Sequence, residues 1–337
     1  SDFFAAIGSV RSKVPSLKAV VALKDGPAGW LDYESLVSAN DGARVPDAEV
    51  GADDLQRLMY TSGTTAHPKG VMITNGNFYW KNIALTIEFA LTAADKTLVI
   101  GPLYHVAGLD LPALIVLYIG GSLVIIRRFE PVAALEAIQR EKATNVWVAP
   151  TMLNMLLHEP SLPQYDLSSL RLIIDGGEKM PLPLIQRLLA LIPHVWFADA
   201  YGLTETVSGD SALERDKVIE KIGSVGKPVL HLKLKIVDDQ GREVPPGQDG
   251  EILLKGPKVF PGYWQNPKAT ADAIRDGWFH TGDIGQLDED GYLYIIDRKK
   301  DMIISGGENI ASAEVERVLY EDPRVLEAAV VGQPHPR

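Results

Sequence analysis

The sequence contains no cysteine, few aromatic residues and fewer basic than acidic side chains. Without cysteine it can form no disulfide, no thiolate metal site and no thiol nucleophile. Its 33 lysines and arginines against 44 aspartates and glutamates give a net charge of -11, so we expect no nucleic-acid partner, and any bound phosphate needs a local cluster of donors. The composition otherwise, 46% hydrophobic and 23% charged over 337 residues, is typical of a globular protein with two or three packed units.

An uninterrupted hydrophobic run is also missing. Residues 109–126 are strongly apolar and long enough to approach a membrane span, but Asp110, Pro112 and a glycine pair interrupt them. The pattern indicates instead a buried helix over residues 114–119, then a turn and a buried strand over residues 122–126. The first residues show no basic segment or cleavage pattern of a signal peptide, so we expect no transmembrane segment and a cytoplasmic location.

Short β-branched runs alternate with helical stretches through the middle of the chain. The predicted strands and helices occupy, in order, residues 97–100, 109–118, 123–126, 132–142, 145–148, 151–158, 170–174 and 182–191. Alternation of this kind predicts an α/β fold with a largely parallel sheet covered by helices.

After about residue 230 the pattern changes to strands joined by tight turns. Strands are predicted within residues 232–237, 251–255 and 285–296, with turns at residues 238–241 and 288–291. These features indicate an antiparallel β subdomain.

The last part of the sequence contains a basic run, a glycine pair, a predicted helix over residues 312–320 and a predicted strand over residues 326–331. We interpret it as the beginning of a small α+β C-terminal domain. The predicted domains are residues 1–228, the α/β part of a large N-terminal domain, residues 229–297, the antiparallel β subdomain, and residues 298–337.

The first motif that indicates chemistry is YTSGTTAHPKG, residues 60–70. Hydroxyls and backbone amides in a loop between β elements can surround phosphate oxygens, and a lysine at the end of the loop adds a positive charge. It is not a Walker A sequence, because the spacing from glycine to lysine differs and no Ser or Thr follows the lysine. The alternative is a Ser/Thr-rich surface turn.

A second motif, DAYGLTET at residues 199–206, follows a predicted strand and brings two carboxylates, a flat aromatic ring and a hydroxyl into one short loop. These groups suit an adenine amino group, a purine face, a phosphate oxygen and a magnesium ion.

Two further motifs follow, WFHTGD at residues 278–283 and DRKKDMIISGGEN at residues 297–309. Considered alone, Asp283 would be a turn carboxylate and residues 297–300 a solvated run of charges.

In this order and spacing, the four motifs resemble those of the adenylate-forming superfamily, which includes acyl-CoA synthetases, firefly-type luciferases and peptide-synthetase adenylation domains. The resemblance runs from about residue 55 to the end of the chain. It implies ATP- and Mg²⁺-dependent activation of a small carboxylic acid, fatty or aryl, to an acyl-adenylate with release of pyrophosphate. Transfer of the acyl group to CoA would follow. Oligomeric state is not implied.

The resemblance also implies roles for individual residues. The β- and γ-phosphates of ATP would be held by Thr61, Ser62, Gly63, Thr64, Thr65 and Lys69. The adenine would be lined by Gly176, Gly177, Glu178 and Ile295, stacked on Tyr201 and hydrogen-bonded to Asp199, with Gly202 beside it. Ile295 has the alternative of being a core residue of a hairpin.

Thr204 would contact the α-phosphate, Glu205 would bind Mg²⁺, and Asp283 and Arg298 would bind the ribose hydroxyls. The residues implied in catalysis are Lys69, Thr204, Glu205 and His105. One departure is Ala66, where members of the superfamily usually have glycine; if that position needs a positive φ, alanine costs roughly 1 kcal/mol.

PLYHVAGL at residues 102–109 resembles the form found in acyl and aryl synthetases, which favours an uncharged acid. The implied acyl pocket comprises His105, Val106, Gly108, Gly177 and Val207. His105 could instead cap the following helix. Gly306 and Gly307 would line the CoA tunnel, and Lys300 would be the hinge between the two half-reactions.

The superfamily has more chain on both sides of this sequence, including a C-terminal lysine that contacts the reacting groups, so the resemblance implies that the sequence is cut short. Two alternatives to a CoA ligase therefore stay open. One is an acyl-AMP ligase that delivers to a carrier protein. The other is a module that binds ATP and acyl-adenylate with little activity.

Overall fold

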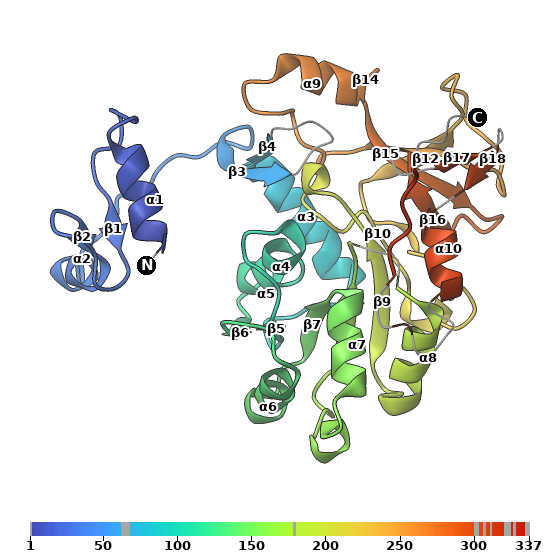
Figure 1. The fold of residues 1–337 in the computed structure, drawn as a ribbon, viewed down its shortest axis with the longest axis horizontal. Helices are drawn as coiled ribbons and strands as arrows, with labels where there is room; N and C mark the ends of the chain where they lie inside the picture. Colours follow the sequence, from blue (N-terminus) through green and yellow to red (C-terminus); the bar gives the residue numbers. More distant parts are fainter. Residues whose placement is uncertain are drawn as a thin grey trace. The chain divides into compact units, whose positions relative to one another are not determined.

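The computed structural model describes residues 2–61, 68–177, 180–299, 303–305, 308–310, 312–319, 325 and 328–333. The chain divides into two compact units, Ser1–Glu49 and Val50–Arg337 (Figure 1).

The first unit is small and mixed in structure. It contains α1 (Asp2–Arg11), β1 (Val21–Ala22), β2 (Leu31–Asp32) and α2 (Tyr33–Ala39), and the two strands pair in parallel. Asp32 ends β2 and caps α2, because its carboxylate accepts a hydrogen bond of 2.8 Å from the amide of Ser35.

The centre of the second unit is a seven-stranded sheet in the order β11-β10-β9-β8-β7-β5-β6. Its strands are β5 (Lys96–Val99), β6 (Ser122–Ile125), β7 (Asn145–Val148), β8 (Leu172–Asp175), β9 (Trp196–Tyr201), β10 (Ser211–Ala212) and β11 (Lys227–Pro228). Strands β5 to β9 are parallel, and β10 and β11 add antiparallel pairs at one edge. Every residue of β7, β8 and β9 is buried, as expected for parallel strands covered on both faces.

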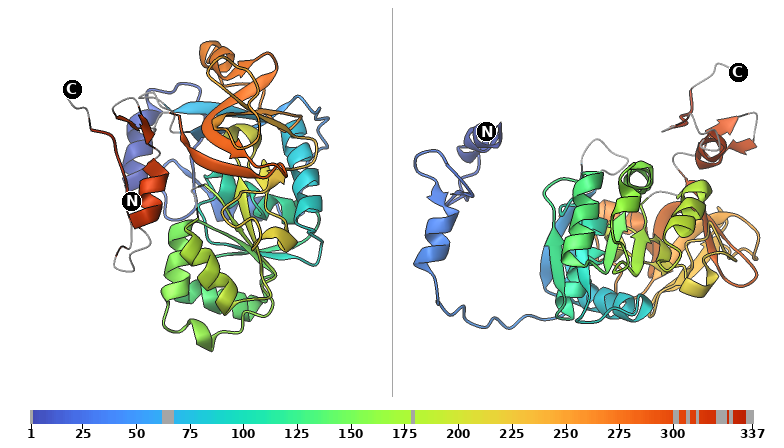
Figure 2. Two further views of the ribbon diagram at one scale, coloured as in Figure 1. Left: turned by 90° about the vertical axis from the view of Figure 1, so that its right-hand side faces the viewer. Right: turned by 90° about the horizontal axis from the view of Figure 1, so that it is seen from below.

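Helices cover both faces of this sheet, with α7 and α8 on the side opposite α3 (Figure 2). The helices are α3 (Asn75–Glu88), α4 (Val106–Asp110), α5 (Ala113–Tyr118), α6 (Pro131–Glu141), α7 (Pro150–His158) and α8 (Leu182–Leu191). Local sequence explains several helix starts: Thr74 and Asn77 form a capping box on α3, and α6 and α7 begin with a proline. Short 3₁₀ turns lie at Leu162–Gln164, Thr204–Thr206 and Arg215–Lys217.

The predicted α/β fold with a largely parallel sheet is confirmed. One predicted helix was wrong in its extent: residues 109–118 do not form one helix, because Pro112 lies between α4 and α5. Proline lacks the amide that a continuous helix would need, and its ring clashes with the preceding turn. No helix within the described residues is both long and apolar enough to cross a membrane.

An antiparallel five-stranded sheet follows, as predicted. It contains β12 (Lys233–Val237), β13 (Gly250–Lys255), β14 (Ile274–Arg275), β15 (Trp278–Leu287) and β16 (Leu293–Arg298), with α9 (Pro267–Ala273) before β14. Asp288 closes the turn between β15 and β16 by accepting hydrogen bonds from the amides of Asp290 and Tyr292.

Two further hairpins complete the second unit. The first consists of β3 (Leu55–Thr61) and β4 (Lys69–Thr74), and the second of β17 (Ile303–Ser305) and β18 (Glu308–Ile310), which precedes α10 (Ser312–Leu319). The predicted strand over residues 326–331 was wrong in its described part, since residues 328–331 lie in no strand. The domain boundaries at residues 228 and 297 stay a prediction.

Candidate nucleotide and acyl site

The β3–β4 hairpin positions the ends of the predicted phosphate loop. Thr61 and Lys69 are paired across the two strands, so the loop between them closes a hairpin. Its residues Ser62, Gly63, Thr64, Thr65 and Ala66 lie outside the described part of the chain, and their predicted phosphate contacts stay predictions.

Lys69 and Glu205, both predicted to be catalytic, are brought together by a third residue. The hydroxyl of Tyr263 donates a hydrogen bond of 2.8 Å to Oε1 of Glu205. The ammonium nitrogen of Lys69 lies 4.7 Å from the centroid of the Tyr263 ring, within the range of a cation–π interaction. Glu205, in the 3₁₀ turn Thr204–Thr206, is only 8% exposed. Predicted Thr204 is half-buried beside it.

The surroundings of Glu205 act on its charge in opposing directions. Burial raises the pKa of this carboxyl above its usual value, whereas the hydrogen bond from Tyr263 and the positive charge of Lys69 lower it. The negative charge of Asp283 raises it further. Glu205 is therefore electrostatically linked both to Lys69 and to the predicted ribose-binding carboxylate.

A second cluster contains the predicted adenine- and ribose-binding side chains. The hydroxyl of Tyr201 donates a buried hydrogen bond of 2.6 Å to Oδ2 of Asp283. Nε of Arg298 lies 3.6 Å from Oδ1 of the same carboxylate, because Asp283 and Arg298 pair across β15 and β16. Burial, and then the charge of Asp283, raise the pKa of Tyr201 well above its usual value, so this phenol stays a hydrogen-bond donor.

One alternative considered for these motifs is wrong, and the other holds only for part of its residues. Asp283 is a strand residue in β15 rather than a turn carboxylate. Arg298 and Lys299 are exposed, as expected for a solvated run of charges. Asp297 is instead buried, and its carboxylate accepts hydrogen bonds from the amide and hydroxyl of Ser312 at the start of α10. Lys299 also forms an ion pair of 2.9 Å with Asp239.

The second motif was expected in one short loop, but the structure divides it between a strand and a turn. Asp199 and Tyr201 belong to strand β9, where Asp199 is opposite Asp175 of β8, and only the second half of the motif turns away from the sheet. At Gly202 an added Cβ would lie 2.3 Å from the amide nitrogen of Gly209, so a glycine is needed where the chain leaves the strand.

Glycines also end the neighbouring strand β8. A Cβ at Gly176 would lie 2.7 Å from the carbonyl oxygen of Ala200, and Gly177 has φ of +102°. Gly176 thus permits a close backbone approach between the carboxyl ends of β8 and β9, whereas Gly177 provides a backbone conformation that other residues rarely adopt. Glu178 lies outside the described residues.

A buried lysine that the sequence did not indicate stabilises the turn after Glu205. The ammonium of Lys258 donates to the carbonyl of Ser208 at 2.7 Å and to the carboxylate of Asp210 at 2.9 Å. Asp210 also accepts a hydrogen bond of 2.5 Å from the hydroxyl of Thr206. Because both charges are buried, they depend on each other for compensation.

The predicted acyl-pocket residues lie in three separate chain segments. Nδ1 of His105 accepts a hydrogen bond of 3.2 Å from the amide of Ala107, so the proposed cap on α4 is present. Val106 and Val207 are buried, and a Cβ at Gly108 would lie 2.4 Å from the carbonyl oxygen of Pro102. A role of these residues in acyl binding stays a prediction.

A cluster of buried charges holds the end of α4. Asp110 accepts two hydrogen bonds from Arg57, at 2.5 and 2.6 Å, and its carboxylate lies 3.5 Å from the ammonium of Lys81. Burial lowers the pKa of Lys81 to about 8 against the opposing attraction of Asp110. Lys81 and Asp110 are both fully buried.

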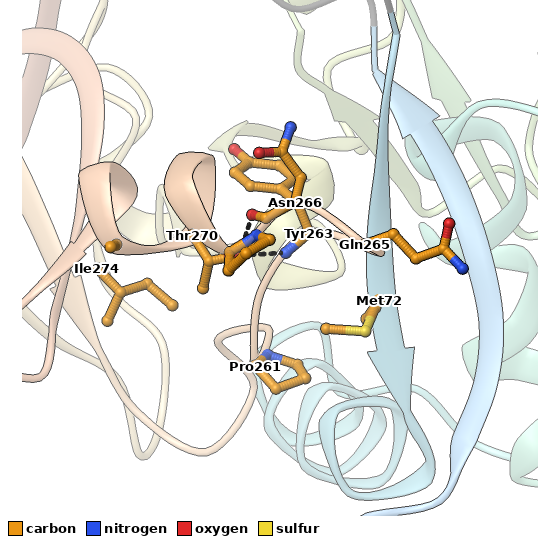
Figure 3. A pocket seen from close by; sticks show the side chains of 9 residues that line it. Met72, Pro261, Tyr263, Gln265, Asn266, Thr270 and Ile274 are labelled. Atoms are coloured by element: carbon orange, nitrogen blue, oxygen red, sulfur yellow. Dashed lines mark hydrogen bonds between the residues drawn. The ribbon is translucent and has the colours of Figure 1, made fainter.

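A groove with a volume of about 520 Å³ lies beside the loop that carries Tyr263 (Figure 3). It is lined by Met72, Pro261, Tyr263, Gln265, Asn266, Pro267, Thr270, Ala271 and Ile274. None of the predicted acyl-pocket residues lines it, so it is separate from the predicted acyl site.

The remaining predicted positions differ in how far the structure describes them. Ile295 is half-buried in β16 and packs against the hydrophobic core, so its alternative as a hairpin core residue is confirmed. Lys300, Gly306 and Gly307, predicted as hinge and CoA-tunnel residues, lie outside the described residues.

Comparison with known proteins agrees with the geometry. The family model described as "AMP-binding enzyme" matches residues 4–264. A feruloyl-CoA synthase of Amycolatopsis is 44% identical over 311 residues, which are 92% of this chain and 62% of that protein.

Two solved structures of the o-succinylbenzoate CoA synthetase of Bacillus subtilis are similar to this chain. The structure in complex with its acyl-adenylate intermediate has a TM-score of 0.80 at 37% identity, with 91% of this chain and 62% of that chain covered. The structure in complex with ATP and magnesium has a TM-score of 0.79 at 38% identity, with 87% and 61% covered. The chain thus spans about three fifths of the length of these relatives. Because the family model matches more than half of its residues, the chain belongs to the AMP-binding enzyme family.

Proposed function

We propose that this protein activates a carboxylic acid with ATP to form an acyl-adenylate and pyrophosphate, and then transfers the acyl group to CoA. The observation that carries the proposal is the placement of Lys69 and Glu205 around Tyr263, electrostatically linked to the cluster of Tyr201, Asp283 and Arg298. A cation and a buried carboxylate suit the phosphates and their metal, and the second cluster offers groups for the nucleoside.

The donor set suits Mg²⁺. Within the described residues no group of three or more His, Asp or Glu side chains could hold a metal alone, and Glu205 is the carboxylate beside Lys69. Mg²⁺ is usually bound by one or two carboxylates together with substrate phosphates and water. When bound, it would supply positive charge that offsets the charge of the phosphate oxygens.

In the first half-reaction a carboxylate oxygen of the acid forms a bond to the α-phosphorus, and the bond to the bridging oxygen breaks, so that pyrophosphate leaves. Lys69 would offset charge on the phosphates, and Thr204 would donate to an α-phosphate oxygen. These residues act by position and charge, so no side-chain nucleophile is needed.

In the second half-reaction the thiol sulfur of CoA forms a bond to the acyl carbonyl carbon. The thiol proton is released, and AMP leaves with the electron pair of the broken bond. Gly306 and Gly307 are proposed to line the thiol's path, and Lys300 to be the hinge between the two half-reactions.

The acid is proposed to be aryl rather than a simple fatty acid, because the names of similar proteins specify feruloyl and o-succinylbenzoyl groups. His105, Val106, Gly108, Gly177 and Val207 are the proposed contacts. We propose a cytoplasmic location, where ATP and CoA are available. The large domain is proposed to extend to residue 228 and the β subdomain to residue 297.

Acid-dependent exchange of labelled pyrophosphate into ATP tests the proposed first half-reaction. The panel is ferulate, o-succinylbenzoate and decanoate, each with and without Mg²⁺. We expect exchange with an aryl acid only when Mg²⁺ is present, and thioester when CoA is added. Exchange without thioester on CoA, but with acylation of a carrier protein, would instead support an acyl-AMP ligase. Absence of ATP binding would contradict the proposal.

A further inference from the structure

We infer that Tyr263 is a positioning residue that holds the metal-binding carboxylate and the phosphate-binding lysine in one geometry. This inference rests on the proposed function, because it assigns Glu205 to Mg²⁺ and Lys69 to phosphate. Tyr263 contacts both residues of that pair.

The two contacts use different parts of the side chain. The hydroxyl donates to Oε1 of Glu205 at 2.8 Å, which fixes the rotation of the carboxylate. The ring face lies 4.7 Å from the Lys69 ammonium, which localises a long and otherwise mobile side chain at the exit of the phosphate loop.

The backbone around Tyr263 is attached to the same two elements. The amide of Phe260 donates to the carbonyl of Glu205 at 2.7 Å. On the other side, the amide of Trp264 donates to the carbonyl of Gly70 at 2.7 Å, and Tyr263 forms an antiparallel bridge with Val71. Residues 260–264 therefore join the strand that follows the phosphate loop to the turn that carries Glu205.

The direction of the Tyr263 ring is set by its neighbours. Gly262 has φ of +149°, and a Cβ there would lie 2.5 Å from Cγ2 of Thr270, so a glycine is needed before Tyr263. The amide of Tyr263 donates to the Thr270 hydroxyl at 2.9 Å. In Figure 3 the Tyr263 ring points away from Pro261, and both residues line the groove.

The test separates the hydroxyl from the ring. Binding of ATP to the 337-residue chain is measured by calorimetry in excess Mg²⁺ and in EDTA, and the ratio of the two affinities is the metal-dependent gain. Tyr263→Phe keeps the ring under Lys69 and removes the hydrogen bond to Glu205. We expect it to lower the metal-dependent gain about tenfold while affinity in EDTA changes less than about twofold. Tyr263→Leu should lower both.

Tyr79→Phe, at an exposed tyrosine of α3, is the matched control and should change neither affinity. If Tyr263→Leu fails to fold, Tyr263→Phe decides the question alone. If Tyr263→Phe shows the same metal-dependent gain in ATP affinity as the wild type, the inference about Tyr263 is overturned, while the proposed function is not. If the wild-type chain itself shows no metal-dependent gain, both the inference and the proposed function are overturned.

Discussion

The bond between Tyr201 and Asp283 allows a quantitative test of the nucleotide end of the site. Asp283→Ala removes the acceptor of a buried, charge-assisted hydrogen bond of 2.6 Å and leaves the Tyr201 hydroxyl without that partner. Hydrogen bonds to charged groups contribute about 1.5–3 kcal/mol, so we expect Asp283→Ala to lower the free energy of unfolding by about that amount. Tyr201→Phe removes the donor and keeps the ring that is proposed to stack on adenine.

A double-mutant cycle isolates the bond itself. Urea unfolding of the wild type, both single variants and the double variant should give a coupling energy of about 1.5–3 kcal/mol. The same variants separate stability from recognition: Asp283→Ala should weaken ATP binding by about 1–3 kcal/mol, since it removes a proposed ribose partner. A coupling energy below about 0.5 kcal/mol would show that this buried hydrogen bond does not stabilise the fold.

Three further predictions concern the charged groups. Glu205→Gln keeps the shape but removes the charge that a hard cation needs, so Mg²⁺-dependent ATP binding should fall at least about tenfold in calorimetry, and an unchanged Mg²⁺ dependence would remove Glu205 from the metal role. Asp110→Ala leaves Arg57 and buried Lys81 without their carboxylate, and we expect a loss of about 3–5 kcal/mol in urea unfolding; a loss under about 1 kcal/mol would contradict it. The folded pKa of Lys81, about 8, lies below its ordinary 10.5, so the folded chain binds fewer protons than the unfolded chain between these pH values, and the free energy of unfolding rises with pH. Lys81→Met should flatten that rise when unfolding is measured at several pH values. An unchanged slope of unfolding free energy against pH would count against the buried cation.

Elements with a strong local signal were predictable from the sequence. β7 and α8 have the predicted bounds, residues 145–148 and 182–191. A continuous apolar run and a helical periodicity are local signals, so they do not depend on how distant segments pack. The two strands joined by a turn at residues 288–291 were also predicted, but the pairing of Asp283 with Arg298 beyond their predicted ends was not.

Contacts between distant segments were not predictable in this way. Tyr263 is 58 positions from Glu205, and Lys258 is 48 positions from Asp210, so neither pair leaves a local pattern. The sequence FPGYW at residues 260–264 does indicate a turn with aromatic neighbours. It does not indicate which carboxylate the tyrosine meets, because that depends on how β4 and the turn after β9 pack together.

The same limit explains the error at the second motif. Asp199 and Tyr201 were expected in a loop because the motif was taken to begin after the predicted strand, yet β9 is buried and extends through both residues. Its neighbours β8 and β10 supply partners on either side, and such pairing overrides local composition.

In the proposed first half-reaction the acid's own carboxylate attacks the α-phosphorus of ATP. Incubation with an aryl acid labelled with oxygen-18 in its carboxylate, followed by CoA and mass spectrometry of the products, tests it most directly. We expect one labelled oxygen in AMP and none in pyrophosphate, because the bond between the carboxylate oxygen and phosphorus persists when the thioester forms. Unlabelled AMP, or label in pyrophosphate or in inorganic phosphate, would contradict attack by the carboxylate on the α-phosphorus.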